Sequence, residues 1–357
     1  MGYFNPLRAI FGFVAERDLK KTLITLLKIL LPLAIITWLL ASVDPEDLQQ
    51  LRDRQKNWGT LGMAFTVAML AVCITFVRWY LLVRTLHIPF RLRDAFRLGF
   101  LGFLLNFVGV GSVGGDLFKA VFIAREQSNR RAEAVASVLV DRVIGLYALL
   151  LVASGAILFG GVPQSTAALA AICNATLLAT SVGAVCIMMV LVPGFTRGSL
   201  SEFVTGLPKV GHTIGRLIES VRMFRNQYQV MGIILVMSMA VHAMLAVSIF
   251  LIAQGLFGRT PTLGEHMIIV PLSNVAGAIP FMPGGLGTFE FAMEKLYVIV
   301  PADGPGDVIG VLVAMAYRIV TIAIAAVGVV YYWTSRREVR EVIERAEHAN
   351  DDDSATS

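Results

Sequence analysis

The sequence predicts an all-α polytopic membrane protein with about six full spans and two re-entrant half-helix hairpins, arranged as an inverted repeat. Three observations predict this fold: the apolar composition, the lengths of the apolar segments and the alternation of basic and neutral loops. Of the 357 residues, 56% are hydrophobic and only 15% are charged. Soluble domains carry about 25% charged residues, so this composition excludes a soluble enzyme. It also excludes a mainly disordered chain.

Six apolar segments are long enough to cross a bilayer. A hydrocarbon core about 30 Å thick needs about 20 residues of helix, because each residue adds about 1.5 Å. The first segment is too long for the apolar core of a secretory signal and lacks a small-residue cleavage site, so we expect it to remain as an anchor. The predicted spans are Thr22–Ser42, Gly59–Val77 (with an extension to Val83 left open), Val143–Val162, Thr166–Val192, Val230–Phe257 and Val308–Trp333.

The loops between these spans orient the chain. Lys and Arg gather before the first span, between the second and third, after the fourth and after the sixth. Of the alternate loops, 163–165 and 301–307 have no basic residue, and 258–265 has only Arg259. The first external loop is the exception, because Arg52, Arg54 and Lys56 lie there among four acidic residues. Because cytoplasmic loops are enriched in Lys and Arg, the sequence predicts a multi-pass protein of the bacterial plasma (inner) membrane with both termini cytoplasmic.

Two further apolar stretches are broken by glycine-rich turns. Leu98–Val110 reaches only about 20 Å as a helix, and Leu117–Ala124 follows it after the glycines. Met267–Phe281 turns at Pro283–Gly287 and resumes through Val300. Since neither arm spans alone, we predict two re-entrant hairpins whose tips are received by protein or a water-filled cavity. Surface loops between short tilted helices are the alternative.

The elements divide into two halves of one pattern: span, span, hairpin, span. Each half crosses the membrane an odd number of times, so the second half must be inserted upside down relative to the first. Secondary transporters have such inverted repeats with broken helices and bind substrate where the repeats meet. The predicted units are a cytoplasmic segment (1–21), a first membrane repeat (22–162), a second membrane repeat (163–333, with a cytoplasmic loop 193–229) and a cytoplasmic tail (334–357).

Polar residues near the hairpins are the candidate functional residues. Ionisable side chains cost about 2.5–3.5 kcal/mol at the centre of a span, so they normally face the bundle interior. In each half, a carboxylate follows the glycine turn and an arginine follows in the next span. Asp141 and Glu294 are candidates for contacting a head-group amine or for carrying coupling protons. The predicted substrate-binding residues are Gly114, Gly115, Asp116 and Arg142 in the first half, and Gly284, Gly285, Gly287, Glu290 and Arg318 in the second.

These residues also have structural interpretations. A carboxylate at a helix N-terminus caps backbone N–H groups, a contribution of about 0.5–2 kcal/mol. A buried guanidinium needs an anion, which is either a lipid phosphate or an internal carboxylate. The alternatives are therefore capping by Asp116 and Glu290, and internal ion pairs of Arg142 with Asp141 or Asp116 and of Arg318 with Glu290 or Glu294.

Other polar residues of the spans are expected to be structural. Arg78 lies near a span end, where a long side chain extends to the interface. His242 could relay protons, but a lone histidine in a helix bundle more often only bonds a neighbour. Arg318 lies about ten residues into its span, so it is a better candidate for a buried site than Arg142.

The sequence predicts no cofactor and no metal site. Cys73, Cys173 and Cys186 lie in apolar runs without CxxC spacing or a histidine cluster. The net charge of +5 comes from loops beside spans, so the predicted partner is membrane lipid and not nucleic acid. A second copy of the chain, or an enzyme of lipid synthesis, stays open as a protein partner.

Three segments carry a family resemblance: GSVGGDLFKA at residues 111–120, DRVIGL at 141–146 and PFMPGGLGTFE at 280–290. With them, about residues 20–333 resemble the lysylphosphatidylglycerol synthase transmembrane-region family, also called flippase-like domain proteins. The resemblance implies a central cavity surrounded by these segments and a role in moving lipids between leaflets, including aminoacylated phosphatidylglycerol. Other branches are associated with hopanoids or polyprenyl-linked sugars.

The chain departs from the family pattern in two places. Many relatives carry an arginine ahead of the first glycine pair, where this chain has Val110-Gly111-Ser112, which puts one phosphate ligand in doubt. The chain also ends without the cytoplasmic aminoacyl-transferase domain of the bifunctional members, so we do not expect the synthase activity.

The sequence thus predicts a flippase-like lipid transporter for an amphiphilic, phosphate-bearing lipid. The half-helix N-termini at Gly114–Asp116 and Gly284–Glu290 would hold the anion together with Arg142 and Arg318. A membrane-embedded transferase acting on a lipid phosphate is the alternative, with carboxylates as base or metal ligands. An accessory subunit without turnover ranks third, and enzymatic activity stays open.

Overall fold

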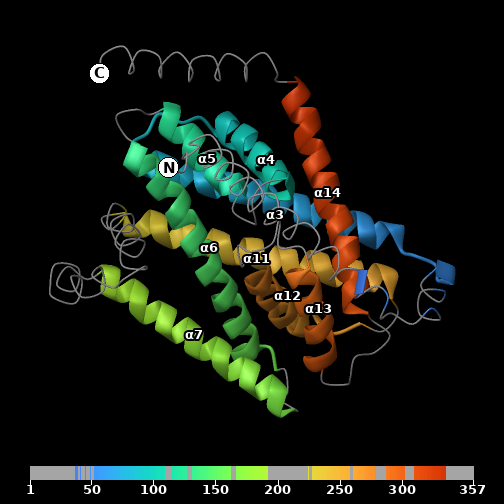
Figure 1. The fold of residues 1–357 in the computed structure, drawn as a ribbon. Helices are drawn as coiled ribbons and strands as arrows, with labels where there is room; N and C mark the ends of the chain where they lie inside the picture. The colour runs from blue at the N-terminus through green and yellow to red at the C-terminus, as the bar shows by residue number, and fades with distance from the viewer. Residues whose placement is uncertain are drawn as a thin grey trace, which may run out of the picture.

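The computed structural model describes residues 52–108, 114–126, 131–161, 166–191, 224, 227–257, 260–278, 287–301 and 309–334, with single positions 37, 38, 41, 45 and 49. Within these ranges all regular structure is α-helical, which confirms the predicted all-α fold. Figure 1 shows the helices packed as one bundle. They are α3 (Trp58–Thr85), α4 (Leu92–Val108), α5 (Gly114–Glu126), α6 (Arg131–Phe159), α7 (Ala167–Leu191), α11 (Tyr228–Leu256), α12 (Leu263–Gly277), α13 (Thr288–Ile299) and α14 (Gly310–Thr334).

Five of the described helices are long and apolar enough to cross a membrane, namely α3, α6, α7, α11 and α14. The protein is therefore a multi-pass membrane protein, as predicted. The predicted span Thr22–Ser42 lies outside the described residues, apart from three single positions. Two helices extend beyond the predicted spans: α3 continues past Val77 to Thr85, and α6 begins at Arg131 instead of Val143. Hydropathy marks only the apolar part of a helix, and charged residues that find partners inside the bundle do not end it.

The two predicted hairpins appear as two pairs of short helices. Helix α4 packs along α5, and α12 packs along α13. A Cβ on Gly115 would overlap the carbonyl of Gly102, so the backbones of α4 and α5 are in direct contact there. The connecting segments 109–113 and 279–286, with Gly284 and Gly285, lie outside the described residues. Re-entry of both pairs into the membrane stays a prediction.

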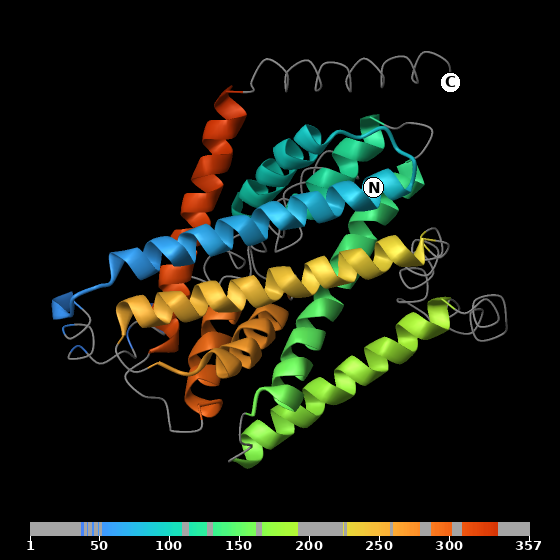
Figure 2. The ribbon, with the colours of Figure 1, turned by 180° about the vertical axis from the view of Figure 1, so that it is seen from behind.

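Helices α3 and α11 lie side by side and antiparallel at the centre of the bundle (Figure 2). The backbone N–H of Asn57, which caps α3, donates to the carbonyl of Gly255 near the end of α11, at 3.1 Å. Further along, the Ser248 hydroxyl donates to the carbonyl of Ala64 at 2.8 Å. A Cβ on Gly255 would lie 2.8 Å from the Leu61 side chain, so the two helices pack closely at this end of the pair.

The packing of one half has a counterpart in the other. Helix α3 contacts α4 and α6, just as α11 contacts α12 and α14. Helix α5 contacts α6 as α13 contacts α14, and α14 contacts α4 as α6 contacts α12. Helix α7 lies at the edge of the bundle against α6 (Figures 1 and 2). An inverted repeat would produce this correspondence, and the repeat itself stays a prediction.

A pair of aromatic side chains joins the two arms of the second short-helix pair. Tyr297 of α13 donates its hydroxyl hydrogen to Nε2 of His266 at 2.7 Å, and Nδ1–H of His266 donates to the carbonyl of Thr262 at 2.9 Å. Since a carbonyl only accepts, the proton of the neutral ring is on Nδ1. Both side chains are fully buried. The pair therefore holds α12 and α13 together within the apolar core of the second half.

Candidate functional site

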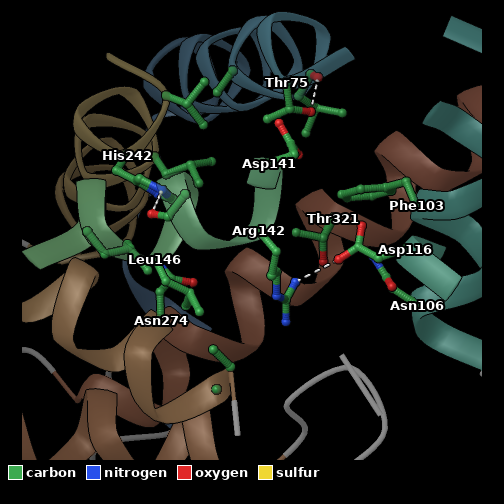
Figure 3. Close-up of a pocket in the computed structure, with 18 of the residues that line it drawn as sticks. Thr75, Phe103, Asn106, Asp116, Asp141, Arg142, Leu146, His242, Asn274 and Thr321 are labelled. Atoms are coloured by element: carbon green, nitrogen blue, oxygen red, sulfur yellow. Dashed lines mark hydrogen bonds and ion pairs between the residues drawn. The ribbon is translucent and has the colours of Figure 1, made fainter. Parts of the chain in front are cut away.

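A cavity of about 350 Å³ lies where the two halves meet, and every described helix except α7 contributes to its wall. Figure 3 shows polar side chains reaching into it from several helices. Among the predicted site residues, Asp116, Asp141, Arg142 and Arg318 line this cavity. The structure thus brings together charged residues as far apart in the sequence as Asp116 and Arg318. Its other polar lining residues are Thr75, Arg78, Asn106, Lys119, His242, Asn274, Tyr317 and Thr321.

In the first half, three charged side chains form a cluster. Nη1 of Arg142, on α6, lies 3.1 Å from Oδ2 of Asp116, in the first turn of α5. Nζ of Lys119, one turn further along α5, lies 3.5 Å from Oδ1 of the same carboxylate and also over the ring of Trp79. Figure 3 shows Arg142 and Asp116 approaching each other from opposite helices. We call Asp116, Lys119 and Arg142 the first-half cluster.

The first turn of α5 is capped by a different residue. Oδ1 of Asn106, on α4, accepts the backbone N–H of Gly115 at 2.8 Å. Among the described residues, the Asp116 carboxylate contacts the side chains of Arg142 and Lys119, so Asn106 and not Asp116 is the cap seen at this turn. Asn106 was not a predicted site residue. Asn106 lies at the end of a short apolar stretch, just before a glycine turn, and this position in the sequence could have identified it as a cap.

In the second half, Arg318 and Glu290 form a closed pair. Nε of Arg318 donates to Oε1 of Glu290 at 2.6 Å, and Oε2 of Glu290 accepts the backbone N–H of Gly287 at 2.7 Å. Glu290 thus both caps α13 and balances the arginine, so both structural interpretations of Glu290 are present. Gly287 has a φ of 85°, a conformation that favours glycine. The guanidinium also lies over the ring of Phe289. We call Arg318 and Glu290 the second-half pair.

A third ion pair was missed by the sequence analysis. Nε and Nη2 of Arg78 donate to the two carboxylate oxygens of Asp141 at 2.8 and 2.9 Å, and Nη1 donates to the hydroxyl of Ser238 at 2.7 Å. Arg78 is buried, so the prediction that it extends to the membrane interface is wrong. The apolar run continues beyond Arg78 as far as Val83. That continuation was the available signal that Arg78 lies inside its span.

The remaining candidates differ in position. Oε2 of Glu294 accepts the backbone N–H of Val311 at 2.8 Å, so Glu294 caps α14, and it is not part of the cavity wall. Nε2–H of His242 donates to the carbonyl of Gly145 at 3.0 Å, which leaves Nδ1 as the acceptor of a neutral ring. Nδ1 is buried without a partner among the described residues. His242 therefore lines the cavity and has one buried acceptor atom without a partner among the described residues.

The charges around the cavity do not cancel. Among the described residues, four basic side chains and two carboxylates line the cavity, and Glu290 pairs with Arg318 from behind the wall. Together these seven side chains have a formal charge of +1. No group of three potential metal ligands occurs within the ranges that the structure describes. The arrangement is suited to holding an anion through guanidinium and ammonium groups. The seven side chains are Arg78, Lys119, Arg142, Arg318, Asp116, Asp141 and Glu290.

The comparisons with known proteins agree with the family resemblance. Residues 25–328 match the family described as "Lysylphosphatidylglycerol synthase TM region". Searches of curated proteins and of solved structures gave no significant match. The family match includes all of the charged cavity residues and extends over most of the chain. The protein therefore belongs to the lysylphosphatidylglycerol synthase TM-region family, a lipid-related family of membrane proteins.

Proposed function

We propose that the protein moves an amphiphilic, phosphate-bearing lipid between the leaflets of a bacterial inner membrane, with both termini in the cytoplasm. The observation that carries this proposal is the charged cavity between the two halves of a multi-pass bundle. A volume of about 350 Å³ is at the small end of ligand pockets. It suits a head group, while the acyl chains stay in the surrounding lipid.

The charge of the cavity supports an anionic head group. An unbalanced charge in a poorly solvated interior is costly, so a bound anion that completes the balance is stabilised there. Guanidinium groups suit phosphate because their N–H donors match two oxygens of one phosphate group. Arg142 and Arg318 reach the cavity from opposite halves. In an inverted repeat this is the location at which transporters bind their substrates.

Transport requires no covalent step from this chain. Its residues bind and orient the head group, and the apolar wall residues separate the head group from lipid. A lipid-phosphate transferase would need a free base or metal ligands. Asp116 and Asp141 of the cavity wall, and Glu290 behind it, are each paired with an arginine, which favours transport over transfer. The expected partner is membrane lipid, with a second copy of the chain or a lipid-synthesis enzyme as a further partner.

Reconstitution tests this proposal directly. Purified protein in vesicles should expose a fluorescent phospholipid of the inner leaflet to an external quencher faster than protein-free vesicles do. Lipids that survive gentle purification should carry a phosphate head group, and the Arg142→Gln/Arg318→Gln double variant should lose that lipid by mass spectrometry. A folded wild-type protein that neither retains nor moves any phospholipid would refute the proposal. Product formation from lipid and donor would favour the transferase instead.

A further inference from the structure

We infer that two copies of this chain associate in the membrane through the outward face of α7, with Asn174 of one copy bonded to Asn174 of the other. The inference goes beyond the proposed function, because it names a contact surface, its partner and the residue that fixes the register. Helix α7 lies at the edge of the bundle, against α6 (Figures 1 and 2). It is also the described helix that takes no part in the cavity wall. A partner on α7 would therefore leave the cavity of each copy unobstructed.

The polar side chains of α7 differ in their hydrogen bonds. Toward α6, the hydroxyl groups of Thr180 and Ser154 lie 2.7 Å apart. On the outward face, the hydroxyl of Ser181 donates to the carbonyl of Leu177 at 2.8 Å. Asn174 is exposed on that face, and its side-chain amide makes no hydrogen bond within the described part of the chain. The Asn174 amide is therefore the polar group of α7 that a partner can still satisfy.

Asn174 lies within the hydrocarbon part of its span. It is the eighth of the 25 residues of α7, and the hydrocarbon core takes about 20 residues of a helix. Whichever consecutive residues of α7 occupy the core, the eighth is among them. An amide that faces lipid without a hydrogen bond is costly, so a neighbouring helix that supplies one is bound there.

A second copy of the chain supplies that hydrogen bond. An asparagine amide contains both donors and an acceptor, so two such amides can bond each other. Two copies in one membrane have the same orientation, so a two-fold axis along the membrane normal brings both Asn174 side chains to the same depth. A single asparagine in the seam of two parallel helices fixes their register in this way. A partner of another sequence would need a polar group of its own at this depth.

The exposed residues around Asn174 have the spacing that two parallel helices require. They follow one another at intervals of three and four residues, as in a heptad seam. The larger apolar members are each more than half exposed, so they are available for contact. We call these residues the α7 stripe: Ala171, Asn174, Leu178, Ser181, Val185 and Met188.

Cysteine cross-linking of the full chain in lipid vesicles tests this surface. After the three native cysteines are replaced by alanine, Leu178→Cys should give a disulfide-linked dimer on oxidation. Ile319→Cys is the matched control, because Ile319 is 69% exposed on α14, and it should give much less dimer. Equal linking at both positions would indicate random collision and overturn the inference. Linking of Leu178→Cys to a cysteine within residues 22–42 of the same chain would also overturn it, since that segment would then cover the stripe.

Single-molecule photobleaching of labelled protein, diluted stepwise in lipid, tests the role of Asn174. Asn174→Leu should weaken association about tenfold, as expected for loss of a hydrogen-bonded pair between helices. Asn174→Gln keeps the donors and the acceptor and should retain most of the association. Val236→Ala alters an exposed apolar residue of α11 and should have no effect. A monomeric wild type, or an Asn174→Leu variant that associates as tightly as the wild type, would overturn the inference.

The vesicle transport assay separates this inference from the proposed function. A dimer that depends on Asn174 but moves no phospholipid would refute the proposed function and leave the α7 stripe in place. Phospholipid movement by a wild type that is monomeric at every dilution would refute the inference alone.

Discussion

The first-half cluster and the second-half pair share a plan and differ in their surroundings. In each, a carboxylate in the first turn of a short helix bonds an arginine of the next long helix, 26 or 28 residues further along the chain. In the first half, Asn106 accepts the backbone N–H of Gly115 at the start of α5. The Asp116 carboxylate therefore contacts two cations, Lys119 and Arg142. In the second half Glu290 takes both the backbone N–H and the arginine.

This difference shows how one sequence pattern supports two roles. Where a separate residue caps the helix, the carboxylate and its cations stay partly exposed at the cavity. Where the carboxylate caps the helix itself, the ion pair becomes a buried brace between α13 and α14. The comparison predicts that the second half responds to mutation mainly in stability, and the first half mainly in lipid binding and transport.

The largest expected effect is on stability, from Arg318→Gln. This change leaves the fully buried Glu290 carboxylate without its cation, which costs about 3–5 kcal/mol for buried pairs. The free energy of unfolding in mixed detergent micelles measures it. The double variant Glu290→Gln/Arg318→Gln should recover much of the loss, since a glutamine oxygen can still accept the N–H of Gly287. An equal loss from Arg142→Gln would contradict the distinction between the halves.

The next effect is on transport, from Arg142→Gln. Loss of this charge from the partly exposed first-half cluster should slow lipid movement about tenfold to a hundredfold. This is equivalent to about 1.5–3 kcal/mol, the contribution of a hydrogen bond to a charged group. The vesicle quenching assay measures the rate, and the amount of inserted protein is checked alongside. The comparison requires that the Glu290→Gln/Arg318→Gln variant retain more transport than Arg142→Gln. The reverse order would place the anion at the second-half pair.

A smaller loss of stability is expected from Gly287→Ala. At a φ of 85°, a side chain costs about 1–2 kcal/mol. The change should also weaken the bond between the Gly287 N–H and Glu290, because the strained backbone shifts. Unfolding in mixed micelles measures the loss. Gly62→Ala is a suitable control, since a Cβ there meets nothing within 4 Å; similar losses from both variants would mean that the positive φ is not responsible.

The smallest expected effect is from Asn106→Ala, which removes the cap of α5. A lost helix cap costs about 1 kcal/mol. Without Asn106, the backbone N–H of Gly115 competes with Arg142 and Lys119 for the Asp116 carboxylate. The two cations then lose part of their fixed orientation toward the cavity, so phospholipid binding should weaken as well. Asn106→Asp supplies an acceptor at the same position and should keep the stability. A variant that is destabilised but binds phospholipid as tightly as the wild type would separate capping from binding.

Hydropathy and local patterns predicted the helices and the residues of both ion pairs, because a charged residue within an apolar run needs a partner inside the protein. These patterns left two possible carboxylate partners for each of Arg142 and Arg318. In the structure, Arg142 pairs with Asp116 and Arg318 pairs with Glu290. The pair of Arg78 with Asp141 was missed, since its members are 63 residues apart and no local pattern connects them. The difference between the halves also depends on Asn106, whose contact follows from the close approach of α4 and α5.

The bonds of Arg78 have a mechanical consequence. They join α3 and α6 of the first half to α11 of the second through buried polar atoms. Parting the two halves at this point would keep the pair with Asp141, which lies in the first half, but would break the bond to Ser238. One N–H group of a buried guanidinium would then lose its acceptor, which is costly. If one half rocks against the other during a working cycle, we expect the hinge to lie at Arg78 and the opening to grow with distance from it.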